Sequence, residues 1–328
     1  PVLQVKGRYL KKKLYSVVSS DDFQKFMEGF KLEHMFEHIP FSCFAEEMKV
    51  KLGVDLEDMI WDLYDSRGIP CFYVKDIEQH KTKEGYVLSF DIWNSSRNEG
   101  VISLYTAMKK DYMQFREFKN ITVEAGTCKH WEVVLPDWVN AAGVSTNMAM
   151  NLPNMYLQYF KEEPEEVEST IGERMLDSIS FLPFAGEIIV DDEDAGFRTV
   201  ETKSRGLLKR DNGKEREYLH MVYMSMEDFP EWKSSISPEA YGNPYRSFHL
   251  KKSGKEKSYV EWNTCLPETG EYEVFIHHLS LNLRLQFNSE LFSYYYTLEQ
   301  GDFKADIRID FNGSGDRKVI VTDNLGRE

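Results

Sequence analysis

The sequence predicts a multidomain, mainly β protein, with a short all-α segment at the N-terminus followed by two β-sandwiches. Three observations lead to this prediction. Apolar residues recur at helical spacing early in the chain, they alternate with polar residues in short runs farther on, and an acidic stretch divides these runs into two groups. The predicted parts are a helical segment over 1–70, a β-sandwich over 71–160, an acidic linker with a short helix over 161–185, and a second β-sandwich over 186–328.

The first part contains three amphipathic patterns in a row. Apolar residues at i, i+3, i+4 and i+7 lie on one face of a helix. The three sets are Phe23, Phe26, Met27 and Phe30; Phe41, Phe44, Ala45 and Met48; and Leu56, Met59, Ile60 and Leu63. An earlier helix is expected around Leu14 and Val17. Ser20 and Asp21 suit the start of the first pattern, and Gly53 suits the end of the second.

The second part begins where the period changes to two. Apolar and polar residues alternate over 86–93, and the turn-rich stretch 94–100 ends this strand. Further short strands are expected over 101–107, 121–124, 131–135 and 144–152. Turn residues recur about every ten positions, which is typical of an all-β sandwich of about 90 residues.

The third part, over 161–168, is acidic, interrupted by Pro164 and nearly free of apolar residues, so it is the expected linker. A short helix through Met175 and Ile179 is expected to follow it. The second β region should start with the apolar run over 186–190, with later strands near 245–251, 259–262, 270–277, 283–287, 291–299, 303–311 and 318–322.

Charge and hydropathy exclude two classes of partner. Asp and Glu number 55 against 40 Lys and Arg among 328 residues, a net charge of −15, which repels a nucleic-acid backbone. The densest basic run, Lys11–Lys13, is short and lies within a helical pattern. The sequence contains no apolar stretch of the 18 or more residues that a membrane span needs.

The start of the chain and the cysteines add two expectations. The chain begins at Pro1 without an initiator Met or a signal pattern, so it reads as a piece of a longer protein. Cys43, Cys71, Cys128 and Cys265 lie far apart and form no C-x-x-C motif. This spacing favours isolated thiols over disulfides and leaves the redox compartment open.

One motif matches a zinc-binding signature. His34-Met35-Phe36-Glu37-His38 matches H-x-x-E-H, in which two histidines one helical turn apart bind Zn²⁺ and the glutamate is the general base. The motif needs a continuous helix and a third ligand. Pro40 disfavours the helix beyond His38, and no second signature supplies the ligand, so a pair of histidines at a helix end is favoured.

A second motif is a run of four carboxylates after an apolar strand. Asp191, Asp192 and Asp194 are weak candidates for calcium, because hard oxygen ligands in a loop suit that ion. The run lacks the spacing of an EF-hand, so a turn with carboxylates that accept backbone N–H groups is favoured. No other cofactor is predicted.

The last part is rich in aromatic residues, whose faces stack on sugar rings. The candidate ligand-binding residues are Trp232, Tyr241, Trp262 and Tyr295. Core packing is the favoured alternative for each taken singly. Alternation along 294–296 places Tyr295 on the face opposite its neighbours, so at least one of these tyrosines should be exposed. The sequence contains no G-x-S-x-G, phosphate-binding glycine loop or H-E-x-x-H, so no catalytic residue is predicted.

Residues 5–75 resemble the end of the helical catalytic domain of aminopeptidase N-like (gluzincin) metallopeptidases. The resemblance is carried by V-K-G-R-Y-L at 5–10, F-Q-K-F at 23–26, F-S-C-F at 41–44, G-V-D-L at 53–56, Ile60-Trp61 and G-I-P at 68–70. It implies that an immunoglobulin-like sandwich follows, up to about residue 160. The zinc ligands of that family lie upstream of the matching segment, so no catalytic role is carried over, and 34–38 should connect two helices.

Residues 186–328 resemble the golvesin and xanthan-lyase C-terminal-like β-sandwich modules of secreted bacterial enzymes. The matching strings are I-I-V-D-D-E-D-A-G-F at 188–197, Y-V-E-W at 259–262, L-P-E-T-G-E-Y-E-V-F at 266–275 and Y-Y-Y-T-L at 294–298. The resemblance implies a jelly-roll type sandwich that serves as an accessory, carbohydrate-binding module. Members usually continue with a Gly-Trp and further strands, which this chain lacks, so the completeness of the module is in question.

Together these resemblances imply the non-catalytic C-terminal region of a bacterial, extracytoplasmic metallopeptidase-like protein. Its expected partners are the upstream catalytic domain and a polysaccharide or cell-surface glycan. Two alternatives stay open. The sandwiches are purely structural spacers, or the chain is a zinc-dependent hydrolase that uses His34, Glu37 and His38.

Overall fold

The computed structural model describes most of the chain, in two compact units. The described residues are 2–65, 68–83, 85–108, 114–167, 173–181, 188–201, 231–238, 240–251, 258–267, 270, 272–278, 292–311 and 315–319. Unit 1 comprises residues 1–185 with the short segment Asn243–Tyr245, and unit 2 comprises Gly186–Gly242 and Arg246–Glu328. Over the described residues the fold is mainly β with four α-helices, which confirms the predicted mainly β class.

Four helices open unit 1: α1 (Val2–Val17), α2 (Ser20–Glu33), α3 (Phe41–Leu52) and α4 (Leu56–Asp65). The three amphipathic helices and the earlier one are therefore confirmed. The cap of α2 lies one residue before the predicted position, because the Ser19 hydroxyl accepts the N–H of Asp22 at 3.0 Å. Gly53 ends α3 in the left-handed conformation at φ 70° and donates its N–H to the carbonyl of Lys49.

The helices share a small apolar core. Met48 is fully buried, and Phe26 of α2 packs on Phe44 of α3 with ring centroids 5.7 Å apart. The other buried members are Leu14, Val18, Ala45, Val54 and Leu56. Helices of 10–16 residues are at best marginally stable alone in water, so this shared core stabilises the four together.

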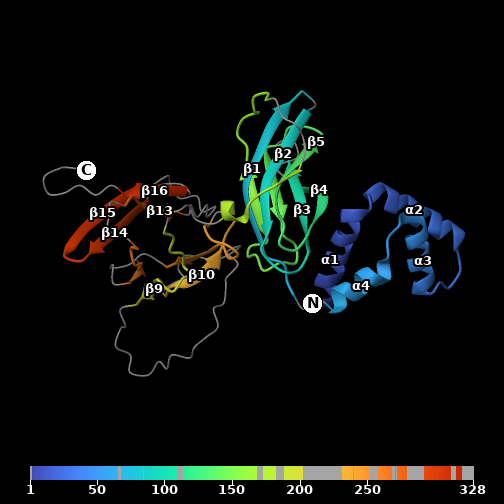
Figure 1. Ribbon diagram of the computed structural model, residues 1–328, viewed down its shortest axis with the longest axis horizontal. Coiled ribbons are helices and arrows are strands. Elements are labelled where there is room, and N and C mark those ends of the chain that lie inside the picture. The colour runs from blue at the N-terminus through green and yellow to red at the C-terminus, as the bar shows by residue number, and fades with distance from the viewer. Residues whose placement is uncertain are drawn as a thin grey trace, which may run out of the picture. The chain divides into compact units, whose positions relative to one another are not determined.

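One helix also packs on the β part of unit 1. The backbone N–H of Val101 donates to the Tyr9 hydroxyl of α1 at 3.1 Å, and the Ser16 and Thr122 hydroxyls lie 2.8 Å apart. Tyr9 is buried there, and this burial raises the pKa of its phenol. Figure 1 shows α1 beside the sheet that contains β3 and β4.

The β part of unit 1 consists of two four-stranded antiparallel sheets. One has the order β1-β2-β5-β8 and the other the order β4-β3-β6-β7. The strands are β1 (Phe72–Thr82), β2 (Gly85–Asn94), β3 (Gly100–Ala107), β4 (Arg116–Val123), β5 (Cys128–Leu135), β6 (Ala141–Ser145), β7 (Met155–Tyr159) and β8 (Glu173–Met175). Figure 1 shows the two sheets face to face.

The core between these sheets draws apolar residues from both. Phe72, Phe90 and Ile92 come from the first sheet, and Ile102 and Leu104 from the second. All five are fully buried. This shared core makes the arrangement a β-sandwich, in agreement with the alternating pattern of the sequence.

A buried polar side chain fixes one end of the sandwich. The Asn94 amide, at the end of β2, donates to the carbonyls of Asn98, Val123 and Glu124 at 2.8–3.2 Å. Its carbonyl oxygen accepts from the backbone N–H and hydroxyl of Ser96. Asn94 therefore ties the β2–β3 connection to the end of β4.

Two predicted elements of unit 1 are wrong. The strand expected over 144–152 ends at Ser145, and the chain forms a loop in which Asn151 bonds the backbone of Phe72. The helix expected through Met175 and Ile179 is replaced by β8 and a 3₁₀ turn, Ser178–Phe181. β8 pairs with β5, so an open sheet edge outweighs the local helical pattern.

Unit 2 contains four two-stranded antiparallel sheets among its described residues. β9 (Phe197–Val200) pairs with β12 (Tyr259–Trp262), and β10 (Lys233–Ile236) with β11 (Ser247–Leu250). β13 (Val274–His278) pairs with β16 (Gly315–Val319), and β14 (Phe292–Gln300) with β15 (Phe303–Phe311). Residues 188–190 form no strand, contrary to prediction, and the strand expected over 283–287 lies outside the described residues.

Among the described residues, no helix combines the length and apolarity needed to cross a membrane. The four cysteines are free; Cys71 and Cys128 are buried, and burial raises the pKa of both thiols.

Candidate functional site

Three polar side chains of unit 2 form a hydrogen-bonded array, which we call the Asp192 array: Asp192, His249 and Ser234. The carboxylate Oδ2 of Asp192 lies 3.0 Å from Nδ1 of His249, and Nε2 of the same ring lies 2.8 Å from the Ser234 hydroxyl. Ser234 on β10 and His249 on β11 are direct cross-strand partners. The antiparallel register therefore sets the second contact.

Asp192 is the buried end of the array, with 6% of its surface exposed. The Ser247 hydroxyl donates to Asp192 Oδ1 at 2.5 Å, so both carboxylate oxygens have partners. Because an ionised carboxylate only accepts, it keeps the proton of a neutral His249 on Nδ1, and Nε2 then accepts from the Ser234 hydroxyl.

Asp192 lies in the acidic turn that contains the candidate calcium ligands of the sequence analysis. Asp194 Oδ2 accepts the N–H of Asp191 at 2.7 Å, and Asp191 Oδ1 accepts the N–H of Asp192 at 2.9 Å. These bonds form the carboxylate-stabilised turn that was favoured over an ion site. Burial, then the neighbouring carboxylates, raises the pKa of Asp191 from 3.8 to about 6. The structure does not bring Asp191, Asp192 and Asp194 together as one ligand set within 4.8 Å.

Aromatic rings lie beside the Asp192 array. The ring centroid of Phe197 is 4.8 Å from that of His249 and 5.7 Å from that of Trp262. Trp262 is 46% exposed. Contacts run from the half-exposed indole of Trp262 through the rings of Phe197 and His249 to the hydroxyl of Ser234. We call these four residues the Trp262 surface.

Trp232, another predicted aromatic, lies on the same pair of sheets. Its backbone N–H donates to Glu201, the residue after β9, at 3.0 Å. The Lys251 ammonium lies 6.0 Å from the Trp232 ring centroid and 2.7 Å from the Glu201 carboxylate. Trp232 is half-buried, so part of it packs and part of it faces solvent.

The other two predicted aromatics lie on different elements. Tyr241, between β10 and β11, is exposed and lies 5.7 Å from the His277 ring of β13. Tyr295 of β14 is 66% exposed, which confirms the expected exposed tyrosine, and the Arg308 guanidinium lies 5.8 Å from its ring. The structure therefore brings Trp232 and Trp262 onto one pair of sheets, and places Tyr241 and Tyr295 elsewhere.

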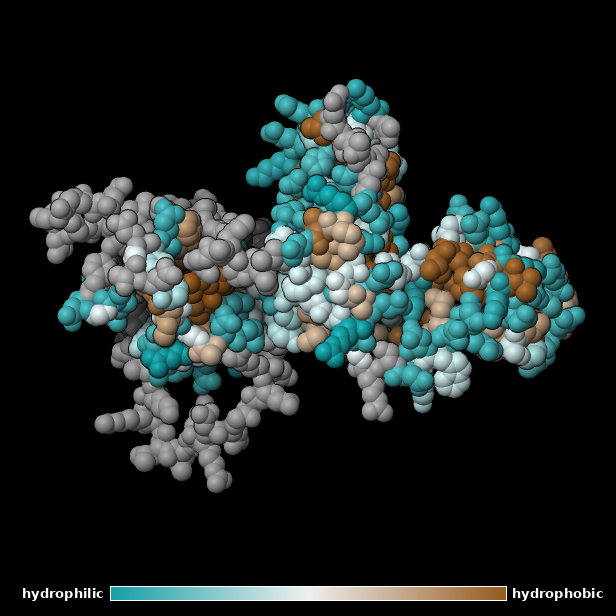
Figure 2. Space-filling model, in the orientation of Figure 1, coloured by the Kyte–Doolittle hydropathy of each residue, from teal (hydrophilic) through white to brown (hydrophobic). Residues whose placement is uncertain are grey.

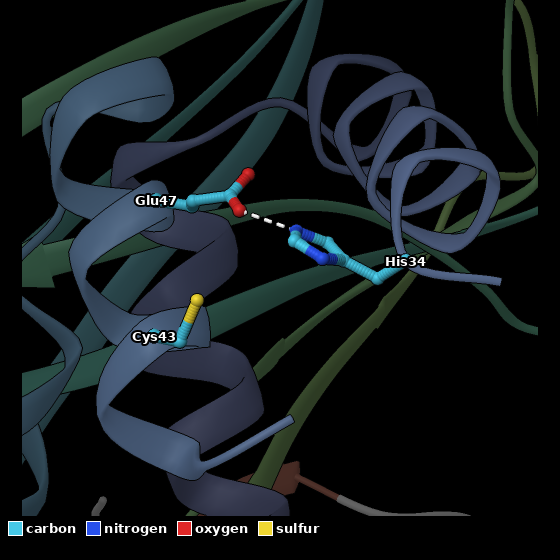
Figure 3. Close-up of side chains that lie close together, drawn as sticks. All are labelled: His34, Cys43 and Glu47. Atoms are coloured by element: carbon cyan, nitrogen blue, oxygen red, sulfur yellow. Dashed lines mark hydrogen bonds and ion pairs between the residues drawn. The ribbon is translucent and has the colours of Figure 1, made fainter. Parts of the chain in front are cut away.

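The H-x-x-E-H string of unit 1 lies in the connection between α2 and α3, as expected, and not on a continuous helix. His34 Nε2 lies 2.6 Å from the Glu47 carboxylate of α3 (Figure 3). The other ring nitrogen, Nδ1, lies 3.2 Å from the Glu37 carboxylate. The two carboxylates, Glu47 before Glu37, raise the pKa of His34. The side chain of His38 is exposed.

Cys43 joins His34 and Glu47. In the described parts of the chain, this is the one group in which three His, Cys, Asp or Glu ligand atoms lie within 4.8 Å of one another. The Lys51 ammonium, 2.8 Å from Glu47, and then His34 lower the pKa of Glu47. All three members are half-buried.

Sequence reasoning missed five residues of these sites, Phe197, Ser234, His249, Cys43 and Glu47. Cys43 and Glu47 are four apart on a predicted helix, so their shared face was a usable signal. Ser234 and His249 carry no local signal, because only the β10–β11 register makes them neighbours. No protein-family model, curated protein or solved structure matches the chain.

Proposed function

We propose that the chain is an accessory, non-catalytic region that binds carbohydrate through the Trp262 surface of unit 2. One observation carries the proposal: the half-exposed Trp262 indole and the His249 ring of the Asp192 array both pack against the ring of Phe197. The structural spacer remains the alternative that the experiment below tests.

The chemistry of a sugar fits this surface. A pyranose ring presents C–H groups on its faces and hydroxyls at its rim, so it needs an aromatic face and nearby hydrogen-bonding groups together. Trp262 offers the first, and the Ser234 hydroxyl oxygen, which can accept a hydrogen bond while it donates to His249, offers the second. Because Asp192 orients His249, which in turn orients Ser234, little side-chain freedom is lost on binding.

The family resemblances supply the context of the proposal. A golvesin-like module of jelly-roll type in unit 2 would be a glycan-binding accessory of a secreted or envelope enzyme, and it places the protein outside the bacterial cytoplasm. In unit 1, strands β1, β2 and β5 share one sheet, and strands β3, β6 and β7 share the other. This division supports an immunoglobulin-like sandwich, with the fourth strand paired to the third.

The upstream catalytic domain is the proposed protein partner. Figure 2 shows hydrophobic residues gathered over the helical segment. The large apolar side chains exposed there include Leu3, Leu32, Met35, Phe36, Phe41, Val50, Trp61 and Tyr64. A set of this size supports contact with a further protein element.

The proposal is tested by affinity electrophoresis of the full chain against a panel of bacterial and plant polysaccharides. We expect retardation by at least one of them, lost in Trp262→Ala and weakened in Ser234→Ala. Trp61→Ala is the matched control, because it removes an exposed indole from unit 1. No retardation by any polymer would favour the spacer, and equal loss in both tryptophan variants would show that the Trp262 surface is not the binding site.

A second candidate is a serine hydrolase, because Asp192, His249 and Ser234 follow the order of a catalytic triad. In that role, the Ser234 oxygen would attack an ester carbonyl while its proton passes to Nε2 of His249. Labelling of Ser234 by a fluorophosphonate, with ester hydrolysis lost in Ser234→Ala, would establish this activity. The accessory proposal predicts neither labelling nor hydrolysis.

A further inference from the structure

We infer that His34, Cys43 and Glu47 form a zinc site that joins the end of α2 to α3. Their ligand atoms, an imidazole nitrogen, a thiol sulfur and a carboxylate oxygen, all lie within 4.8 Å of one another. These are the three ligand types that zinc uses in proteins. The inference is independent of glycan binding, because the site lies in unit 1.

The backbone explains why the three residues meet. Cys43 and Glu47 are four residues apart on α3, so their side chains leave the same face of the helix. His34 is the C-cap of α2, where its backbone N–H donates to the carbonyl of Phe30. In Figure 3, His34 and Glu47 point toward each other and Cys43 lies one turn away on α3.

The present separations allow a metal after small side-chain movements. Zinc bonds of about 2.0–2.3 Å in tetrahedral geometry place ligand atoms about 3.3–3.7 Å apart. The 2.6 Å contact between His34 Nε2 and Glu47 would open slightly, and the Cys43 sulfur would move inward. Three protein ligands leave the fourth position to water, and the half-buried site admits the ion.

Neighbouring residues already orient the ligands. Glu37 lies 3.2 Å from Nδ1 of His34, the arrangement in which a carboxylate holds a metal-binding histidine and directs its other nitrogen at the ion. The Lys51 ammonium forms an ion pair with the second carboxylate oxygen of Glu47. The ring centroid of Phe30 lies 4.6 Å from that of the His34 imidazole. One oxygen of Glu47 and Nε2 of His34 therefore face the site.

Zinc would replace protons at this site. The ion needs a neutral His34 with a free Nε2 lone pair and a Cys43 thiolate, so binding releases the thiol proton and any proton on Nε2. Glu47 gives the negative charge that offsets part of the metal charge. This site differs from the zinc site that the H-x-x-E-H motif would form. Its ligands besides His34 are Cys43 and Glu47, whereas the motif would use His38 and a third ligand that the sequence does not identify.

The test is titration of the metal-free, reduced full chain with Zn²⁺ by calorimetry, and with Co²⁺ by absorption spectroscopy. We expect one metal per chain and a thiolate-to-cobalt charge-transfer band. His34→Ala, Cys43→Ser and Glu47→Gln should each weaken binding at least tenfold, with folding checked by circular dichroism. His38→Ala and Cys265→Ser are the matched controls and should bind as the unsubstituted chain does.

Three results would overturn the inference: no stoichiometric metal, a cobalt complex without the thiolate band, or loss of binding in His38→Ala with retention in Cys43→Ser. If a ligand variant fails to fold, the cobalt spectrum of the unsubstituted chain still decides whether a thiolate is bound.

Discussion

Replacing Asp192 with alanine should loosen the β10–β11 sheet of unit 2. The carboxylate is 6% exposed and accepts from the Ser247 hydroxyl at 2.5 Å and from His249 Nδ1 at 3.0 Å. Removing it leaves a buried hydroxyl and an imidazole N–H without their main acceptor. Asp192 is thus the residue on which the geometry of the Trp262 surface depends.

The size of the effect follows from those two contacts. A hydrogen bond to a charged group contributes about 1.5–3 kcal/mol, and an unpaired buried partner costs a comparable amount. Ser247 can turn to Glu193, which lies 3.4 Å away, so we take the lower end for that contact. With the lower end taken for the His249 contact as well, the sum is about 3 kcal/mol, which corresponds to roughly a 150-fold increase in local opening.

The assay is hydrogen exchange read by mass spectrometry on peptides that cover 233–236 and 247–250. We expect faster exchange in Asp192→Ala, a smaller change in Asp192→Asn, and little change in Asp194→Ala, which alters the same turn at an exposed position. Peptides of unit 1 serve as the internal reference. Equal exchange in the Asp192→Ala and Asp194→Ala variants would refute the reasoning.

Three further predictions concern single side chains. Asn94→Ala should lower the free energy of unfolding of unit 1 by about 3 kcal/mol, because three backbone carbonyls lose their donor; urea unfolding followed by near-UV circular dichroism checks this, and a change below 1 kcal/mol would contradict it. The folded state raises the pKa of Asp191 to about 6, so it holds that proton more tightly than the unfolded chain, and stability falls as pH rises from about 4 to about 6. Asp191→Asn should therefore stabilise unit 2 by about 1 kcal/mol at pH 7, after allowance for solvent screening, and by nothing near pH 3.5; a benefit that is equal at both pH values would be inconsistent with this cause. Phe36→Ser should leave the melting temperature within a degree or two of that of the unsubstituted chain, because the ring is fully exposed; calorimetry with a clear loss of stability would show that the ring is packed.

The local part of the fold could be predicted from the sequence. Helix faces and strand alternation are set by residues close in the chain, so α2, α3, α4 and β2 were found with small errors at their ends. β8 was mistaken for a helix because its pairing with the edge of β5 depends on residues about 45 positions away. Local patterns cannot report such a partner.

The candidate sites divide in the same way. Asp192 stands in an acidic run of the sequence, but its partner His249 is distant in the chain, and strand register aligns His249 with Ser234. His34 belongs to an H-x-x-E-H string, yet its neighbours in space include Cys43 and Glu47 of the next helix. In both cases the sequence indicated a chemically active residue, and tertiary packing selected its partners.

The central claim is that Trp262 is the residue on which a glycan stacks. It is tested most directly by ¹⁹F NMR of the full chain labelled with 5-fluorotryptophan, in which the 6 tryptophans give separate signals assigned by substitution. On titration with the polysaccharides of the panel, we predict a saturable shift of the Trp262 signal while the signal of Trp61 stays fixed. A Trp262 signal that stays unmoved by every polymer, or that moves only together with Trp61, would contradict the account.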